Sequence, residues 1–335
     1  MKFLFLAGRI RALQSRLLSS AQVERMVMAE TVEDAFRVFS ELQYAEYLFP
    51  DTKVDDFEKI IDQGLLETKE LIVSGTENAV EFDILWKPFD VNNFKRALKE
   101  KLVDDANEIE NFSAENGYEI LGSITKEALE KAVFENEFSA GIPSEFVEAT
   151  QKADELFAET KNFQLVEFLF DNALYVYLNR LSKELKSDFL KKVVVWQIDR
   201  ANLKAMIRAK ALDQPTTDEM YLSGGSMDLA VFKSDITLDS VTAFLFENNF
   251  MHLAMKLKGQ TFESFQDLLL EMERLIEAET TAFLLEADED DLGSIIIPMV
   301  YFLKRVKNAR VLKFVMYAKI YNLDPERIYE TIKHF

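Results

Sequence analysis

Hydrophobic side chains recur at helical spacing along most of the chain. In residues 188–212, five apolar positions fall three to five residues apart along one stripe: Val194, Ile198, Leu203, Met206 and Ile207. The basic residues of this segment lie largely off the stripe, which predicts a helix with one packed face and one solvated or partner-binding face. Segments 165–185 and 269–287 show the same pattern, whereas alternating strand patterns are scarce and the apolar run 193–196 is too short to outweigh its helical flanks. The pattern predicts an all-α protein.

Segment 188–212 resembles the stretch that lies 109 positions earlier in the chain. Of seven residue pairs aligned by this shift, four are identical. The later set is Asp199, Asn202, Leu203, Lys204, Ile207, Arg208 and Lys210, and the earlier set is Asp90, Asn93, Phe94, Lys95, Leu98, Lys99 and Lys101. A shift of 109 positions in the other direction gives four further identities, at Leu312, Lys313, Ala318 and Lys319. We call the positions that one such shift places in register a column of the repeat. At ordinary composition, two residues in one column would be identical by chance about once in sixteen, so the agreement exceeds chance.

Two other sites show nearly the same spacing. The stretches FEKIIDQGL, VEFLFDNAL and LIEAETTAF, at 57–65, 166–174 and 275–283, align at this same shift and pair Asp62 with Asp171. The stretches that begin at Thr125 and Thr237 align at a slightly larger shift. Three sites in one order predict an internal triplication, with three similar helical-bundle domains at 1–120, 121–232 and 233–335. The joins are expected in 111–122 and 213–225.

The repeated segment carries two polar residues on one helix face. Asp199 and Asn202, like Asp90 and Asn93, stand three positions apart. If that face points inward, the pair must be hydrogen-bonded, because buried polar groups need partners. The recurrence therefore predicts that the two side chains hydrogen-bond to a neighbouring helix and hold it in place, an arrangement that we call the polar lock. The third copy has Asn308 and Val311 in these columns, so it is expected to lack the lock.

Composition narrows the class of partner. The net charge is −20, which disfavours binding to nucleic acid and direct docking on anionic lipid. Only ten glycines and six prolines occur, which favours long helices with few hinges, and the absence of cysteine excludes disulfides. The longest uncharged run, 292–303, is shorter than the roughly 20 residues of a spanning helix. The six apolar residues before Arg9 are too few for a secretory signal of about 7 to 15 apolar residues.

Catalytic and metal-binding patterns are weak. The two histidines, His252 and His334, do not make a multi-histidine metal site or a catalytic triad, and no Gly-Lys pair exists for a phosphate-binding P-loop. No Glu-x-x-His occurs for a di-iron bundle, and the acidic run 286–291 lacks the glycine and ligand order of a calcium loop. The sequence thus predicts a non-catalytic protein without cofactor or metal, and a carboxylate metalloenzyme is the less favoured alternative.

The N-terminal segment differs from the acidic remainder. An apolar stripe at Leu6, Ile10, Leu13 and Leu17 runs beside arginines at 9, 11, 16 and 25. One interpretation is a helix lying on a membrane surface. The favoured one is a helix that packs its stripe on its own domain and offers its arginines to acidic neighbours.

Four stretches resemble the C subunit of V-type ATPases, which is called d in the vacuolar enzymes: RIRALQSRLL near the start, IDRANLKAMIRAK in the middle, YLSGG at 221–225 and IPMVYFLKRVKNARVLK at 297–313. The resemblance spans nearly the whole chain. It implies three three-helix bundles around a pseudo-threefold axis, forming a funnel. The funnel would hold the rotating axle, made of the D and F subunits, and rest on the membrane rotor ring.

The resemblance also implies a peripheral position on the cytoplasmic side of the membrane, one copy per complex, a monomer when isolated and no direct lipid insertion. Basic residues on the repeated helices and at the N-terminus are the candidates for partner binding: Lys204, Arg208, Lys313, Lys319, Arg9 and Arg11. An ordinary solvated face is the alternative for them. A free-standing helical adaptor for other proteins remains the alternative function.

Overall fold

The computed structural model describes residues 3–42, 47, 51–102, 118–213, 216–286 and 295–332. Every regular element in these ranges is helical, which confirms the all-α prediction. The chain divides into two compact units, one formed by Met1–Phe82 with Ala282–Phe335 and the other by Asp83–Thr281. The division into three domains stays a prediction.

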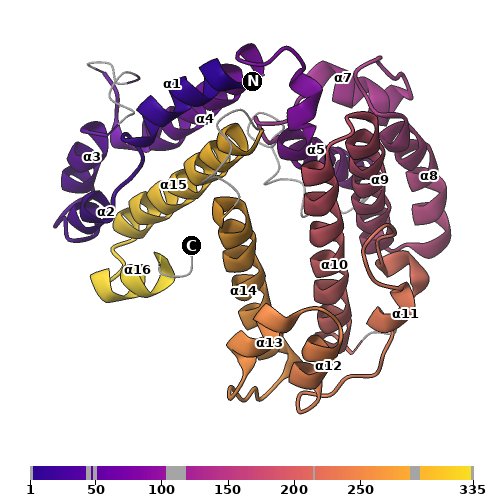
Figure 1. Ribbon diagram of the computed structural model, residues 1–335. Coiled ribbons are helices and arrows are strands. Elements are labelled where there is room, and N and C mark those ends of the chain that lie inside the picture. Colours follow the sequence, from indigo (N-terminus) through magenta and orange to yellow (C-terminus); the bar gives the residue numbers. More distant parts are fainter. Residues whose placement is uncertain are drawn as a thin grey trace. The chain divides into compact units, whose positions relative to one another are not determined.

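The first unit is organised around one long helix, α15. This helix packs against α1, α2, α3 and α4, and the short α16 follows it (Figure 1). The bounds are α1 Leu4–Gln14, α2 Ser20–Val27, α3 Val32–Ser40, α4 Phe57–Ser74, α15 Ile296–Ile320 and α16 Pro325–Ile332. The contact face of α15 is apolar, and Leu312, Val315 and Met316 on it are almost wholly buried.

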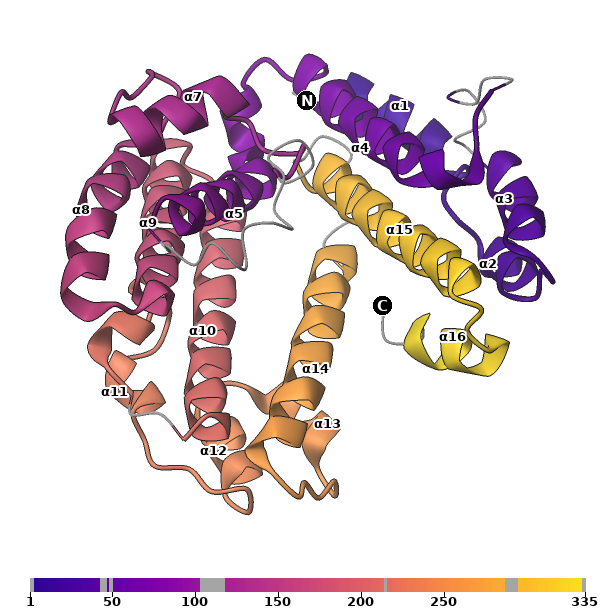
Figure 2. The same ribbon diagram turned by 180° about the vertical axis from the view of Figure 1, so that it is seen from behind.

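The second unit begins with a layer of long helices. Helices α8 and α10 pack on either side of α9, and α5 packs across α9 (Figures 1 and 2). Their bounds are α5 Asp83–Leu102, α7 Lys126–Glu130, α8 Ser144–Thr160, α9 Phe163–Glu184 and α10 Asp188–Ala211. Phe94 of α5 stacks on Phe170 of α9 at 5.5 Å between ring centroids. Aromatic packing of this kind stabilises the helix contact beyond the area it buries.

A smaller group of helices surrounds the C-terminal half of α10. These are α11 Leu229–Phe232, α12 Val241–Glu247, α13 Met251–Leu257 and α14 Phe265–Glu286. Leu203, Met206 and Ile207 of α10 share a buried core with apolar residues of these helices. The stripe predicted from the sequence is thus the packed face of α10.

Local signals explain where α10 begins and ends. Ser187 caps its start, because its side-chain oxygen accepts a hydrogen bond from the Leu190 N–H at 3.3 Å. All five residues of the predicted stripe are buried. The helix ends at Ala211, and Asp213 two positions later has a positive φ of 51° that breaks the helical path.

The N-terminal helix follows the favoured interpretation only in part. Leu6 and Ile10 are fully buried within their own unit, so the apolar stripe packs there. However, α1 ends at Gln14, and a capping box between Ser19 and Gln22 begins a separate helix.

Candidate functional site

The repeated polar residues anchor loops. In α5, the carboxylate of Asp90 accepts hydrogen bonds from the Ser123 N–H and hydroxyl, both at 2.7 Å, and from the Ile124 N–H at 2.9 Å. Asn93 accepts from the Glu119 N–H at 2.6 Å and donates to the Glu119 carbonyl at 3.0 Å. We call residues 118–124 the first docked loop.

The same arrangement occurs on α10. Asp199 accepts from the Ser226 N–H at 2.9 Å and from its hydroxyl at 2.6 Å. Asn202 accepts from the Leu222 N–H at 2.7 Å and donates to the Leu222 carbonyl at 2.9 Å. We call residues 221–227 the second docked loop. The inward polar residues are therefore paired, but their partner is a loop and not the neighbouring helix that we expected.

A short pattern relates the two docked loops. The sequences YEILGS at 118–123 and YLSGGS at 221–226 share a tyrosine, a glycine and a serine at equal spacing. A Cβ atom on Gly122 would lie 2.6 Å from Asp90 Oδ1, and one on Gly225 would lie 2.3 Å from Asp199 Oδ1. Glycine is needed at both positions because the loop backbone approaches the carboxylate too closely for any side chain.

The third copy keeps part of this anchoring. When the side-chain amide of Asn308 in α15 is assigned the orientation that gives both of its polar atoms a partner, it accepts a hydrogen bond from the Leu18 N–H at 2.9 Å and donates to the Lys304 carbonyl at 3.2 Å. Leu18 immediately precedes Ser19, the cap of α2, just as Ile124 precedes Thr125, the cap of α7. The predicted loss of the polar lock is thus incomplete, because one backbone contact remains.

Two of the six basic candidates are engaged inside the first unit. The Lys313 ammonium lies 2.7 Å from the Asp62 carboxylate of α4. Lys319 is 9% exposed and donates to the Ala29 carbonyl at 2.7 Å, and burial lowers its pKa. Both lysines connect α15 to other segments of its own unit.

Arg9 and Arg11 are exposed on α1. Among the residues that the structure describes, neither has a hydrogen-bond or ion-pair partner, so the acidic neighbours that we expected for them are not present there. They share the outer face of α1 with Leu4 and Phe5, whose side chains are 49% and 77% exposed. This face combines positive charge with exposed apolar surface.

Lys204 and Arg208 line a pocket of about 220 Å³ between α9 and α10. Arg208 is exposed and lies 2.8 Å from Glu273 of α14. Lys204 is half-buried and has no ion-pair or hydrogen-bond partner among the described residues. Gln164, Asp171 and Tyr175 of α9 form the opposite wall. The pocket thus places an ammonium group without an ion-pair partner beside two neutral hydrogen-bonding side chains, Gln164 and Tyr175, and beside Asp171, which is paired with Lys95.

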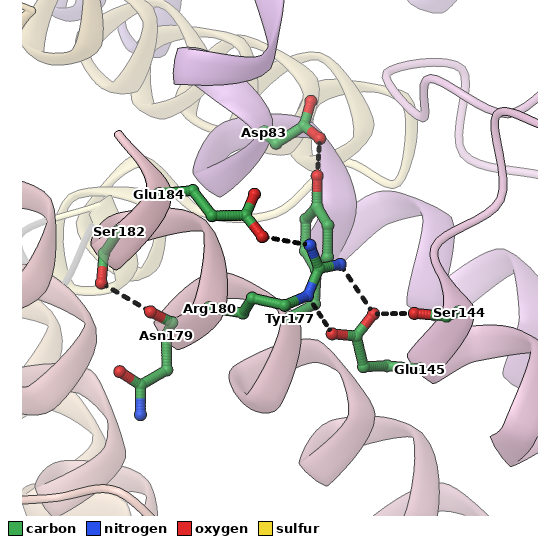
Figure 3. Close-up of polar contacts among 8 residues, drawn as sticks. All are labelled: Asp83, Ser144, Glu145, Tyr177, Asn179, Arg180, Ser182 and Glu184. Atoms are coloured by element: carbon green, nitrogen blue, oxygen red, sulfur yellow. Dashed lines mark hydrogen bonds and ion pairs between the residues drawn. The ribbon is translucent and has the colours of Figure 1, made fainter. Parts of the chain in front are cut away.

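A separate polar cluster ties α9 to its neighbours (Figure 3). The Tyr177 hydroxyl donates to the Asp83 carboxylate at the start of α5, and burial together with this contact raises the pKa of Tyr177. Arg180 contacts both carboxylate oxygens of Glu145 in α8, at 2.7 and 3.0 Å, and Glu184 at 2.8 Å. Burial raises the pKa of Glu145 and is the largest single influence on it, but the hydrogen bonds from Arg180, Ser144 and the backbone, together with the charge of Arg180, outweigh it, and the pKa is lowered.

Several residues that contribute to these contacts were not predicted from the sequence. Lys87 is 5% exposed and reaches both Asp90 and Ser123, so it adds a charge to the first docked loop. Arg305 is 4% exposed and donates to the Gly64 carbonyl at 2.9 Å. One sequence signal could have indicated them. Lys87 and Arg305 are separated by twice the repeat spacing, so they are basic residues at equivalent positions of the first and third copies.

Few of the residues considered for chemistry fall within the described ranges. His252 is exposed, with Nδ1 3.5 Å from Glu279, and His334 lies outside the described residues, as does most of the acidic run 286–291. Within the described ranges, no group of three or more His, Cys, Asp or Glu is placed to hold a metal ion. No helix there is both long and apolar enough to cross a membrane.

Over the described residues, these features define an all-helical protein whose recurring polar residues anchor its own loops. The family model described as the ATP synthase (C/AC39) subunit matches residues 6–331, and the chain belongs to this family. The C subunit of the A-type ATP synthase of Thermococcus onnurineus (strain NA1) is 22% identical over 335 residues, covering 97% of this chain and 88% of the relative. The protein of the same name from Desulfurococcus sp. (strain SY) is 23% identical over 332 residues, covering 96% and 88%. The resemblance to the V-type ATPase family is confirmed.

Proposed function

We propose that this chain is a non-catalytic central-stalk subunit of a rotary ATPase, and that it couples the axle, made of the D and F subunits, to the membrane rotor ring. The observation that carries the proposal is the family match over residues 6–331. Relatives that are named as the C subunit of A-type ATP synthases match almost the whole chain and most of their own length, so the match is not confined to one segment. In this role the protein transmits torque during ATP-linked ion transport and carries out no chemical step.

Several features of the molecule suit such a part. Torque transmission requires stiffness, and the long helices α9, α10 and α15 are each held by buried or partly buried polar contacts. We propose that the three repeated segments form three similar domains in a funnel that receives the axle. The acidic net charge supports contact with ring protein over contact with anionic lipid, at the cytoplasmic side of the membrane.

Co-expression with the axle pair of the same source tests this function. We expect a stable complex with one copy of each protein, measured as a mass by light scattering. A lone monomer under conditions where the axle pair itself is folded would remove the stalk assignment.

The second candidate function, a free-standing helical adaptor, makes a different prediction. The exposed face of α1, with Arg9, Arg11 and Phe5, would then bind a partner other than axle or ring subunits. Pull-down from the source organism with the whole chain separates the two. Recovery of rotary ATPase subunits supports the stalk assignment, and recovery of an unrelated partner without them supports the adaptor.

A further inference from the structure

All three copies of the repeated helix have a lysine at the same position. The aspartate that pairs with this lysine is present in only two of the three copies. The lysines are Lys95, Lys204 and Lys313, each one repeat spacing from the next. The second column, on helices α4, α9 and α14, has Asp62, Asp171 and then Thr280 at the same spacing. The third position of this column therefore lacks a carboxylate.

In two places the lysine and the aspartate meet. Lys95 of α5 lies 2.6 Å from the Asp171 carboxylate of α9, and Lys313 of α15 lies 2.7 Å from the Asp62 carboxylate of α4. All four side chains are partly buried. Each lysine pairs with the acid of the following copy, and the third copy is followed by the first. By this rule the partner of Lys204 would be residue 280.

Thr280 cannot take that role. Its hydroxyl donates to the Ile276 carbonyl of its own helix at 2.7 Å, and a threonine carries no charge to balance an ammonium. Lys204 is left half-buried without a partner among the described residues. Withdrawing a charge from water without pairing it costs free energy, so an unpaired ammonium favours binding an anionic group.

The surroundings of Lys204 favour a carboxylate. Arg208 adds a second cation, although it is shared with Glu273, and Gln164 and Tyr175 offer neutral donors. The one carboxylate in the wall, Asp171, is already neutralised by Lys95. Burial raises the pKa of Tyr175, so its hydroxyl stays protonated and able to donate at neutral pH. The pocket holds about 220 Å³, and a water occupies about 30 Å³ in the liquid, so a short side chain fits.

We propose that the pocket between α9 and α10 receives an aspartate or glutamate side chain of a partner polypeptide, with Lys204 supplying the ammonium that Lys95 and Lys313 give to internal aspartates. The inference rests on the proposed function, which makes the axle the partner. The loss of the acid at residue 280 leaves the binding energy of one ion pair available to that partner.

The test is a pair of charge reversals on one helix. Lys204→Glu changes the pocket, and Lys191→Glu makes the same change at an exposed lysine of α10 that does not line it. Affinity for the axle pair is measured at about 0.15 M salt, where distant surface charges are screened beyond about 8 Å. We expect Lys204→Glu to weaken binding by about tenfold or more, and Lys191→Glu to change it by less than about twofold. Lys204→Met removes the positive charge without adding a negative one. An unchanged melting temperature of this variant shows that the effect on binding is not loss of folding.

Carbodiimide cross-linking adds a direct measurement, because it joins an amine to a contacting carboxylate with loss of water. We expect mass spectrometry of the complex to find Lys204 joined to an acidic residue of the axle pair. Equal affinities for the two charge-reversed variants, or cross-links at other lysines without Lys204, would overturn the pocket assignment and leave the stalk function standing. Failure of the unaltered protein to bind the axle pair would overturn the stalk function itself.

Discussion

The docked loops on α5 and α10 are near copies, whereas the matching face of α15 is different. Asp90 and Asp199 each bind backbone and hydroxyl donors of a loop, across 33 and 27 residues of sequence. The two connections thus differ in length and still present the same groups. On α15 a neutral amide, Asn308, binds the backbone of Leu18 instead.

The comparison shows which part of the motif the structure requires. Asn93 and Asn202 recognise a backbone N–H and carbonyl, not a side chain, and the residues they bind are Glu119 and Leu222. Loop sequence can therefore vary as long as the glycine and serine beside the carboxylate remain. Leaving a buried carboxylate short of hydrogen-bond donors costs more free energy than leaving a neutral amide short of partners, so the α15 face can use a simpler segment.

The largest test of the comparison removes the anchoring side chain from each face. Asp90→Ala leaves two backbone N–H groups without their acceptor and the buried Lys87 ammonium without its counter-charge, and we expect a loss of about 3 kcal/mol in the free energy of unfolding. Asn308→Ala removes one accepted and one donated hydrogen bond, and about 1 kcal/mol is expected. Urea unfolding followed by circular dichroism measures both. Equal losses would mean that the two faces do not differ in the way described.

The two glycines give the second test. Gly225→Ala and Gly122→Ala should each destabilise by about 2 kcal/mol, because the new Cβ displaces the carboxylate from the loop. Gly8→Ala is the matched control, since nothing lies within 4 Å of a Cβ built there and Gly8 is inside α1. Replacing a helical glycine with alanine should raise stability by about 0.5 to 1 kcal/mol. A neutral result at Gly225 and Gly122 would show that the loops can dock in another way.

Helical spacing made the fold class and the packed face of α10 predictable, because amphipathic helices bury their stripe wherever they pack. For Asp199 and Asn202 the sequence predicted hydrogen-bonded partners on the condition that their helix face points inward, and both residues are buried and hydrogen-bonded. The docked loop was missed because its YxxxGS pattern, at 118–123 and 221–226, repeats at a shorter spacing than the helices do, so no single shift aligns both.

Long-range pairs were beyond prediction for a different reason. Lys313 and Asp62 are 251 residues apart, and nothing local to either residue indicates the other. Lys319 has the same column position as Lys210, yet Lys319 is buried against the Ala29 carbonyl and Lys210 reaches an exposed aspartate, Asp235. Equivalent positions of two copies can thus share a residue type and still differ in burial and in hydrogen-bond partners. The burial and partners depend on the segments that pack around each copy.

Glu145 gives the smallest test, because its carboxylate is held by a side chain instead of a docked backbone. Glu145→Gln should lower stability at pH 7 by less than Asp90→Ala, since Arg180 is partly exposed and water can replace much of the contact. The pKa of Glu145 is lowered in the folded state, so its contribution is present above the ordinary value of 4.5 and is lost as the pH falls through the folded pKa. The difference in the free energy of unfolding between the unaltered protein and Glu145→Gln, measured by urea unfolding from pH 7 to pH 3, should therefore shrink in acid. A difference that persists at pH 3 would show that Glu145 acts through packing and not through its charge.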